Sequence, residues 1–410
     1  MGRPSKISVG IISAVIGKTP EEIANSFVFD EAYCLAKKGI DVHVIRRRVE
    51  GKALSYRIHF HGLERKVDAR AVESMLENLR VYPPVSLLRN PARIYWENVY
   101  AVNVSKVIEE NKIDLIHAHF AYPEGLAGLL AKRKTERPLI LTSHGWDLNV
   151  IKEYNYGRRL QRRYDALIRR IVQESDHIIV PSNLLYKRSL EIGVADSKIS
   201  IIPDAVDTSI FHPGLNGSLF RKKYGLGNEP IILTIRSLTL HYRVDKVIKV
   251  AKMMPEKIRC KFVIIGGGEE RDKLVSLAGE LINKRIYFIG RVPHTEIPQA
   301  TAAADIVFDP CPIGQGINVL EAMACAKPVI GIDTRDLWDY VVDGETGFLV
   351  NFNDEQTIAE KIIYLIQKME ESKRMGMKGR KIVEEKYNID KRSNQIISLY
   401  NSLLGRGAVS

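Results

Sequence analysis

The sequence is poor in cysteine and has no long hydrophobic run. Its 410 residues include four cysteines, none of them in a C-x-x-C pair: Cys34, Cys260, Cys311 and Cys325. Such sparse cysteines are typical of buried thiols in a reducing compartment. The longest apolar runs, such as "HIIVP" and "KFVIIGGG", fall far short of the roughly 20 residues that span a bilayer. We therefore expect a cytoplasmic protein with reduced, buried cysteines.

Several motifs of catalysis and cofactor binding are also absent. The chain has no G-x-x-x-x-G-K-[ST], no G-x-G-x-x-G at its first strand and no G-x-S-x-G. These absences disfavour P-loop ATPases, nicotinamide dehydrogenases and α/β-hydrolases. No Cys/His cluster has metal-ligand spacing, and no D-x-D motif occurs. We therefore predict no metal site, no required metal and no permanently bound cofactor.

Basic residues outnumber acidic ones, with a net charge of +12 and a pI near 9.3. The excess favours an anionic partner, although a solvated Lys-rich surface is the alternative. The stretch "GRRLQRRYDALIRRI" predicts a helix with apolar residues on one face and arginines on another: Arg158, Arg159, Arg162, Arg163, Arg169 and Arg170. Such a helix either contacts an anionic membrane surface or packs on its own domain with the arginines in water. No nucleic-acid-binding module is recognisable.

Short β-branched runs alternate with helical patterns along most of the chain, which is typical of parallel α/β sheets. The expected strands of the first half are "ISVGII", "DVHVI", "DLIHAH", "LILTS", "HIIVP" and "ISIIP". Those of the second half are "PIILTI", "KFVIIGG", "RIYFIG", "DIVFDP", "KPVIGI" and "GFLV". The first run follows a basic start like that of a signal peptide, but no A-x-A-like cleavage site follows, so we interpret it as a buried strand.

The alternation occurs twice, with a Gly-, Pro- and Asn-rich break around residues 205–229. We therefore predict a Rossmann-like domain over residues 1–205, a second over 206–385, and a C-terminal helical segment over 386–410.

In a doubly wound sheet, ligands bind beyond the carboxyl ends of the strands. Arg236 follows one expected strand, Gly266-Gly267-Gly268 follows another, and His119 and His144 follow two strands of the first half. Glycines let phosphate approach the backbone, and a following helix N-terminus attracts anions. Because any tight βα turn can use glycines, this signal is weak alone. The stretch "PCPIGQGINVLEAMACAKPVIG" contains one acidic residue, Glu321, which either caps a helix or holds a sugar hydroxyl.

Several segments stand in order along the chain: "SFVFDEAYCLAKKGIDVHVI", "DLIHAHFAYPEGLAGLLA", "PLILTSHGWDL", "IIPDAVDTSIFHP", "IGGGEERDKL", "YFIGRVPHTEIPQATAAADIVFDPC", "NVLEAMACAKPVIG" and "DGETGFLV". Together they resemble glycosyltransferase family 4, whose members are retaining, nucleotide-sugar-dependent enzymes of GT-B fold. The resemblance runs over nearly the whole chain. It implies two facing Rossmann-like domains with parallel sheets and a C-terminal helix that returns to the N-domain.

The resemblance also implies roles for individual residues. Glu321 matches a glutamate that holds the nucleotide ribose, and Arg236 matches an arginine at the diphosphate. Arg291 and Val292 match a segment that reads the base, and His119 matches a histidine near the donor sugar. The turn and helix start that approach the donor phosphates match Gly314, Gly316, Asn318, Val319 and Leu320. His144 and Asp147 are acceptor-side candidates, while His119 as a satisfied core histidine and Asp147 as a helix N-cap are the structural alternatives.

Three positions depart from the family pattern. Ile313 stands where the family has the first glutamate of E-x7-E, and Tyr242 stands where it has a phosphate-binding lysine. "SAVIGK" replaces the usual glycine pair after the first strand. Arg243 and Lys246 are candidates to supply the missing positive charge. The first departure puts the donor-sugar contacts in doubt.

The resemblance implies transfer of a sugar from a UDP- or GDP-sugar to a glycan or lipid-linked acceptor, without nucleic acid. The enzyme would work in the cytoplasm, peripherally at the inner membrane face. Two alternatives stay open: a GT-B sugar-nucleotide epimerase and a non-catalytic relative that binds a glycan or nucleotide.

Overall fold

The structure, a computed structural model, describes residues 6–13, 26–47, 58–63, 66, 68–83, 90–313, 316–334 and 337–406. The chain forms two compact units. The N-terminal unit contains the described residues up to Pro203 together with those from Arg392 onward, and the C-terminal unit contains residues 204–391. The last helix, α15 (Ile389–Leu403), therefore begins in the C-terminal unit and continues in the N-terminal one.

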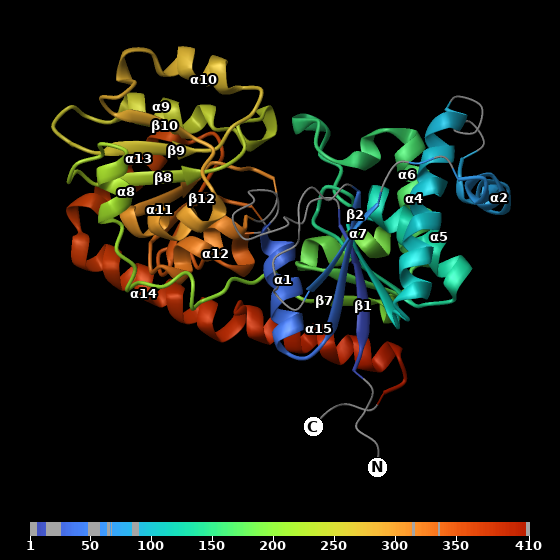
Figure 1. Cartoon of the computed structure of the whole chain (residues 1–410). Helices are drawn as coiled ribbons and strands as arrows, with labels where there is room; N and C mark the ends of the chain where they lie inside the picture. The colour runs from blue at the N-terminus through green and yellow to red at the C-terminus, as the bar shows by residue number, and fades with distance from the viewer. Residues whose placement is uncertain are drawn as a thin grey trace. The chain divides into compact units, whose positions relative to one another are not determined.

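The N-terminal unit is built on a seven-stranded parallel sheet with the order β3-β2-β1-β4-β5-β6-β7 (Figure 1). Its strands are β1 (Ser8–Ile12), β2 (Asp41–Arg47), β3 (Ile58–Leu63), β4 (Leu115–His119), β5 (Leu139–Thr142), β6 (His177–Val180) and β7 (Ile199–Ile201). Its helices, besides α15, are α1 (Ser26–Lys37), α2 (Arg70–Glu77), α4 (Pro91–Glu110), α5 (Leu126–Thr135), α6 (Arg162–Glu174) and α7 (Asn183–Glu191).

The C-terminal unit is built on a six-stranded parallel sheet with the order β10-β9-β8-β11-β12-β13 (Figure 1). Its strands are β8 (Ile231–Ile235), β9 (Lys261–Ile265), β10 (Ile286–Gly290), β11 (Ile306–Asp309), β12 (Val329–Ile332) and β13 (Gly347–Val350). Its helices are α8 (Ser218–Lys223), α9 (Asp245–Met253), α10 (Arg271–Ala278), α11 (Ile297–Ala303), α12 (Ile317–Ala324), α13 (Glu355–Gln367) and α14 (Met369–Lys386).

The inner strands of each sheet are buried on both faces, which is why they are largely apolar. All five residues of β1 are buried, with Val9 and Ile11 in one apolar cluster and Ile12 in another. In the second sheet, Leu233 and Ile232 likewise belong to different clusters. Successive side chains of a strand point to opposite faces. Each unit therefore has two apolar layers, one on either side of its sheet.

All twelve expected strands are confirmed, including the first, so the strand interpretation of the N-terminal run holds. Strand β3, with the sequence "IHFHGL", was not predicted. The arginine-rich stretch is not one helix, because Arg158–Leu160 forms a separate 3-10 turn before α6. The Gly- and Pro-rich break contains the short helix α8.

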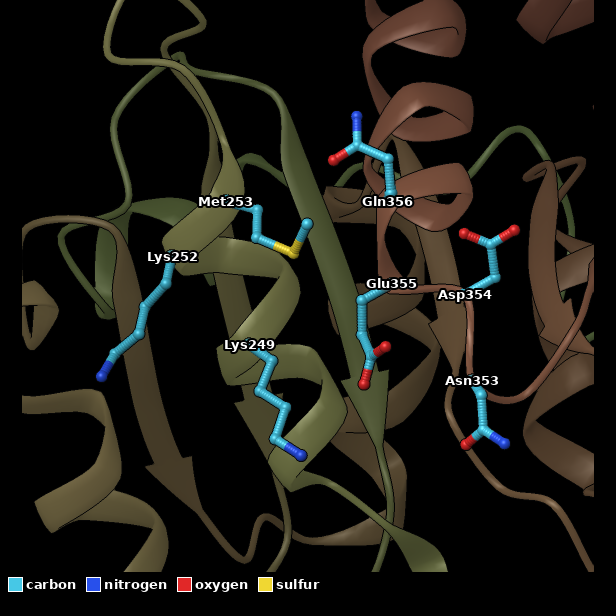
Figure 2. A pocket seen from close by; sticks show the side chains of 7 residues that line it. All are labelled: Lys249, Lys252, Met253, Asn353, Asp354, Glu355 and Gln356. Carbon is cyan, nitrogen blue, oxygen red and sulfur yellow. The ribbon is translucent and has the colours of Figure 1, made fainter.

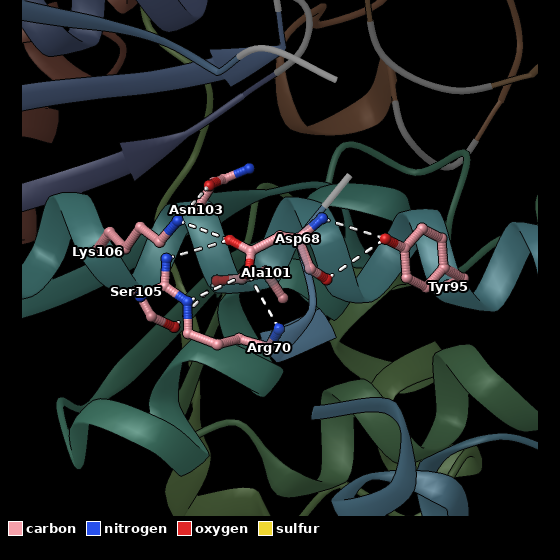
Figure 3. Close-up of polar contacts among 7 residues, drawn as sticks. All are labelled: Asp68, Arg70, Tyr95, Ala101, Asn103, Ser105 and Lys106. Carbon is pink, nitrogen blue, oxygen red and sulfur yellow. Dashed lines mark hydrogen bonds and ion pairs between the residues drawn. The ribbon is translucent and has the colours of Figure 1, made fainter. Parts of the chain in front are cut away.

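Asp68 ties the start of α2 to α4 (Figure 3). Its carboxylate accepts hydrogen bonds from Lys106 Nζ at 2.7 Å and from the side chain of Arg70 at 3.2 Å. The Asp68 N–H donates to the hydroxyl of Tyr95 at 3.2 Å. Hydrogen bonds from Lys106 and then Arg70 hold the pKa of Asp68 well below its usual range. This cluster fixes a peripheral helix to the unit.

The four cysteines are buried thiols, as expected. No helix in the described part of the chain has the length and apolar character needed to cross a membrane.

Candidate functional site

In the C-terminal sheet, the strand order reverses between the neighbouring strands β8 and β11. Such a switch point is where open α/β sheets bind ligands, beyond the carboxyl ends of the strands. Arg236 directly follows β8, and Asp309 is the last residue of β11. The predicted arginine therefore lies at the switch point.

Arg236 and Asp309 form a buried, bidentate ion pair. The Arg236 Nε and Nη2 atoms lie 2.9 and 2.6 Å from the two Asp309 oxygens. Burial lowers the pKa of Arg236, but the attraction of Asp309 outweighs it, so the pKa is raised overall and the guanidinium stays charged. This geometry uses two of the five guanidinium N–H donors and leaves three for a ligand. The ring of Tyr242 lies 5.3 Å from the guanidinium carbon.

The N-terminus of α12 lies beside Arg236. A side chain at Gly316 would place its Cβ 2.2 Å from Arg236 Nη2 and 2.1 Å from Asn318 Oδ1, so any larger residue would displace these two side chains. Asn318 is buried, and its Nδ2 has no hydrogen-bond partner among the described residues. An unpaired buried amide costs free energy and points to a missing acceptor.

The other predicted residues of this turn behave differently. The Val319 N–H already donates to the Gly316 carbonyl at 2.9 Å, and Leu320 is buried in the apolar core. Gly314 lies outside the described residues.

Glu321 does not cap α12. The helix begins at Ile317 with Gly316 as its N-cap, and its first turn contains no acidic residue. The capping interpretation is therefore wrong. Glu321 is 6% exposed, and its Oε1 lies 3.5 Å from Nε2 of His294, in the segment that follows Arg291 and Val292. Its carboxylate thus faces the segment predicted to read the base.

The glycine turn after β9 packs tightly against neighbouring backbone. A Cβ at Gly266 would lie 1.9 Å from the Arg236 carbonyl oxygen, and one at Gly268 would lie 2.3 Å from the Leu238 carbonyl oxygen. At Gly267 it would meet Arg291 Nε at 2.9 Å. Close packing alone therefore requires glycine here. The turn packs against both Arg236, predicted to contact the diphosphate, and Arg291, in the segment predicted to contact the base.

The two candidate phosphate cations are already paired with carboxylates. Lys246 is buried, with its Nζ 2.8 Å from Glu355 Oε1, and Arg243 forms a bidentate pair with Asp245 at 2.9 and 3.0 Å. Both also lie over the ring of Phe352, at 4.0 and 4.9 Å.

Figure 2 shows an open pocket lined by α9 and the start of α13. Its polar side chains include Lys249, Asp354 and Glu355, but none of the predicted donor residues. The Asp354 carboxylate accepts from the Thr357 N–H at 2.9 Å as the N-cap of α13, and Glu355 pairs with Lys246. Both carboxylates therefore stabilise the local structure, one as a helix cap and the other as an ion-pair partner.

In the N-terminal sheet, the order reverses between β1 and β4, and His119 ends β4. His119 Nδ1 lies 3.0 Å from Nε2 of His144, so the structure brings these two candidates together. Burial lowers the pKa of His119 to about 3 and that of His144 well below its usual value. His119 Nε2 has no hydrogen-bond partner among the described residues, so His119 is not a fully satisfied core histidine.

Asp147 is buried and holds two loops together. Its carboxylate accepts from the Ala121 N–H at 2.8 Å and from Ser143 Oγ at 2.6 Å. Burial is the largest effect on the Asp147 carboxyl and raises its pKa. No helix begins at this residue, so the N-cap interpretation is wrong.

A second layer of side chains supports His119, and sequence reasoning missed it. Glu31 Oε1 lies 3.4 Å from His119 Nε2, and Glu31 pairs with Arg392 of α15 at 2.8 Å. His117 uses both ring nitrogens, with Tyr400 and Thr142 at 2.7 Å each.

Asp309 and His294 were also missed. Asp309 ends an expected strand, and His294 follows Arg291 by three positions. Their positions in the sequence could therefore have identified both as candidates.

Two family models match the chain in succession. Residues 24–210 match the model described as Glycosyltransferase Family 4, and residues 218–382 match that described as Glycosyl transferases group 1. N-acetyl-alpha-D-glucosaminyl L-malate synthase of Bacillus anthracis is 25% identical over 327 residues, covering 78% of this chain and 79% of that protein. GDP-mannose-dependent alpha-(1-6)-phosphatidylinositol monomannoside mannosyltransferase of Mycolicibacterium smegmatis is 26% identical over 306 residues, covering 72% and 78%.

Solved structures show the same fold. Anabaena Alr3699/HepE in complex with UDP and glucose has a TM-score of 0.76 at 16% identity, covering 97% of this chain and 100% of that chain. Sucrose-phosphate synthase from Thermosynechococcus elongatus has a TM-score of 0.76 at 19% identity, covering 98% and 100%.

Two units with parallel sheets, and polar groups at the switch point of each, define a GT-B protein. The chain belongs to glycosyltransferase family 4, and it is a glycosyltransferase.

Proposed function

We propose that this chain transfers a sugar from a UDP- or GDP-sugar to a hydroxyl of a glycan or lipid-linked acceptor, with retention of the anomeric configuration. The observation that carries the proposal is that two groups flank Gly316 at the β8/β11 switch point: Arg236, which Asp309 holds, and Asn318, whose amide nitrogen has no hydrogen-bond partner among the described residues. The relatives named above include a mannosyltransferase acting on a phosphatidylinositol mannoside, which supports a glycolipid acceptor.

The donor diphosphate would bind at the N-terminus of α12. Three N–H donors of Arg236 remain beyond its bonds to Asp309, and the Asn318 Nδ2 supplies further donors nearby. The helix N-terminus adds a favourable dipole. These groups would stabilise the negative charge that develops on the leaving nucleotide diphosphate, commonly the largest contribution in such catalysis. Since they are fixed cationic and dipolar groups, we propose that no divalent metal is required.

Asp309 would position Arg236 rather than bind the donor. Its bidentate contact fixes the plane of the guanidinium, so the remaining N–H groups point in defined directions. The carboxylate also balances the buried charge while the site is empty.

Glu321 would accept hydrogen bonds from the ribose hydroxyls, and the backbone of the segment at Arg291 and Val292 would contact the base. The position of Glu321 beside His294 supports this, because it places the carboxylate next to that segment. Ile313 is buried and apolar, so it offers no carboxylate to the donor sugar. We therefore expect the nucleotide to supply most of the binding energy of the donor.

His119 would hydrogen-bond a hydroxyl of the donor sugar as a neutral imidazole, and His144 would support it from the acceptor side. Because burial keeps the pKa of His119 near 3, it stays uncharged at physiological pH. Its Nε2, which lies 3.4 Å from Glu31 Oε1 and has no hydrogen-bond partner among the described residues, can then act as a neutral hydrogen-bonding group rather than as a cation.

We also propose that the chain acts in the cytoplasm, peripherally at an anionic membrane surface. The apolar side chains of α6, including Tyr164 and Leu167, are buried within their own unit, so this helix offers charge rather than an inserting face. Asp165 and Glu174 pair with Arg169 and Arg170, which leaves the exposed Arg162 and Arg163 as the main basic contacts.

A nucleotide screen followed by a transfer assay tests the proposed function. A thermal-shift screen against UDP, GDP, ADP and their sugars should show one nucleotide stabilising most, since ligands stabilise by mass action. NMR of the product made with that donor should show the donor's anomeric configuration. Epimerisation of the bare nucleotide sugar would favour the epimerase alternative, and nucleotide binding without transfer or donor hydrolysis would favour a non-catalytic relative.

Asn318→Asp tests the diphosphate assignment. The change keeps Oδ1 but replaces the unpartnered donor with a charged acceptor. We expect affinity for the nucleoside diphosphate to fall by roughly tenfold or more, the equivalent of one charge-assisted hydrogen bond. Affinity for the uncharged nucleoside should change little. Equal losses for both ligands would refute the assignment of Asn318 to the diphosphate.

A further inference from the structure

One face of the N-terminal sheet gathers three histidines and an aspartate at its outer edge. Asp41 and His43 are alternate residues of β2, while His59 and His61 are alternate residues of the edge strand β3. The two strands pair in parallel with His43 opposite His59. Because residues two apart on a strand share a face, all four side chains project from the same side of the sheet.

The atoms of three of these side chains are spaced like metal ligands. Asp41 Oδ2 lies 3.4 Å from His43 Nε2, and Asp41 Oδ1 lies 3.3 Å from His59 Nε2. Ligand atoms of all three residues lie within 4.8 Å of one another. A tetrahedral ion with ligand bonds of about 2.0–2.1 Å has ligand atoms about 3.3–3.4 Å apart. Each short distance is close to an edge of such a tetrahedron, and the two distances use the two different oxygens of Asp41.

The fourth residue, His61, orients one of these ligands. Its Nε2 lies 2.9 Å from His43 Nδ1, and the two rings are stacked with centroids 5.2 Å apart. A histidine that binds metal through one nitrogen usually hydrogen-bonds through the other, which fixes its tautomer.

The buried group of Glu31, His117 and His119 also has closely spaced ligand atoms, but its surroundings oppose a cation. The Arg392 guanidinium occupies Glu31 at 2.8 Å, and both ring nitrogens of His117 are engaged. At the sheet edge, by contrast, the cation beside Asp41 is the exposed Lys6, 3.6 Å from Oδ1. A flexible surface lysine can swing away when a metal ion binds.

We propose that Asp41, His43 and His59 bind a divalent transition-metal ion of the zinc class, with His61 positioning His43 and water completing the coordination. Two imidazoles and a carboxylate suit zinc and its first-row neighbours rather than magnesium or calcium. The ion would fasten the edge strand β3 to β2. It would be separate from the donor and acceptor residues proposed above, so the two proposals can fail independently.

Metal titration of the untagged, chelator-stripped full-length chain tests the site. Zn²⁺, in competition with a chromophoric chelator, should bind at one ion per chain and raise the Tm. Co²⁺ should give the visible absorption of a tetrahedral site. His59→Ala and Asp41→Asn should each weaken binding by at least a hundredfold, and His61→Ala by about ten- to a hundredfold, as expected for a positioning residue. His212→Ala, a histidine change in the other unit, should have no effect.

The side chain of His59 is 58% exposed, so its loss should not prevent folding, whereas the buried His43 is a poorer choice for the test. Absence of Zn²⁺ binding by the folded wild-type chain would overturn the proposal. So would binding that survives both His59→Ala and Asp41→Asn. Binding lost in Glu31→Gln but kept in His59→Ala would move the ion to the buried group and equally overturn it.

Discussion

The Glu321 carboxylate allows a quantitative test of the ribose assignment. Glu321→Gln keeps the shape of a side chain that is only 6% exposed but removes its charge. A hydrogen bond to a charged group contributes about 1.5–3 kcal/mol. At about 1.4 kcal/mol per decade, nucleotide binding should weaken by roughly ten- to a hundredfold.

Stability should change little in the same variant. Glu321 lies beyond the first turn of α12 and does not cap it, so the loss of about 1 kcal/mol typical of a removed cap is not expected. Its contact with His294 is 3.5 Å long and partly solvent-exposed, and it contributes correspondingly little. The variant should therefore separate binding from folding.

Calorimetric titration with a nucleoside diphosphate and its 2′,3′-dideoxy analogue provides the assay. Wild type should prefer the ribose form, and the variant, whose amide oxygen still accepts hydrogen bonds, should show a smaller preference. Glu384→Gln on α14, at a half-exposed position, serves as the matched control and should behave as wild type. If wild type fails to discriminate between the two ligands, Glu321 does not hold the ribose.

Four further outcomes are expected. Arg236→Lys keeps the charge but loses the fork that Asp309 orients, so kcat should fall by about a hundredfold or more; a loss below tenfold would contradict the diphosphate role. Turnover should persist in EDTA, and a loss restored by Mg²⁺ or Mn²⁺ would disprove metal independence. Wild type should co-sediment with anionic vesicles at low salt and Arg162→Glu/Arg163→Glu should not, at about 1 kcal/mol per basic residue; equal sedimentation would exclude this surface. Because the pKa of His119 is about 3 when folded against an ordinary value near 6.5, its contribution to stability is complete above pH 6.5 and is lost as the pH falls toward 3; urea titrations of His119→Gln should show a shallower acid loss than wild type.

The regular elements could be predicted from the sequence because their signals are local. Each of the twelve expected strands is a short apolar run, and burial on both faces of a parallel sheet demands that pattern. Strand β3 was not predicted because "IHFHGL" mixes polar and apolar residues. Among the described strands it lies at the edge of the sheet and pairs only with β2. The stretch around Arg158 was expected to continue into α6, but local periodicity could not reveal the break before Arg162.

The positions of candidate site residues were also predictable, because parallel strands place their carboxyl ends at one edge. Arg236, Glu321 and His119 were all selected by that rule or by resemblance. The residues that pair with them could not be predicted, because they are distant in the sequence. Asp309 lies 73 positions from Arg236, and Arg392 lies 361 positions from Glu31.

The metal-ligand geometry at the sheet edge was likewise visible only in the tertiary structure. The sequence indicated no metal-ligand cluster, because the spacing between His43 and His59 matches no recognisable metal-binding motif. Strand register alone sets them side by side with Asp41. By itself, the sequence determined the strands, the alternation that makes two parallel α/β units, and the side chains at the strand ends, because hydrophobic periodicity is local. Only the tertiary structure decided which charges pair, which histidines stay neutral and which amide has no partner among the described residues, because those properties depend on burial and on contacts between residues distant in the chain.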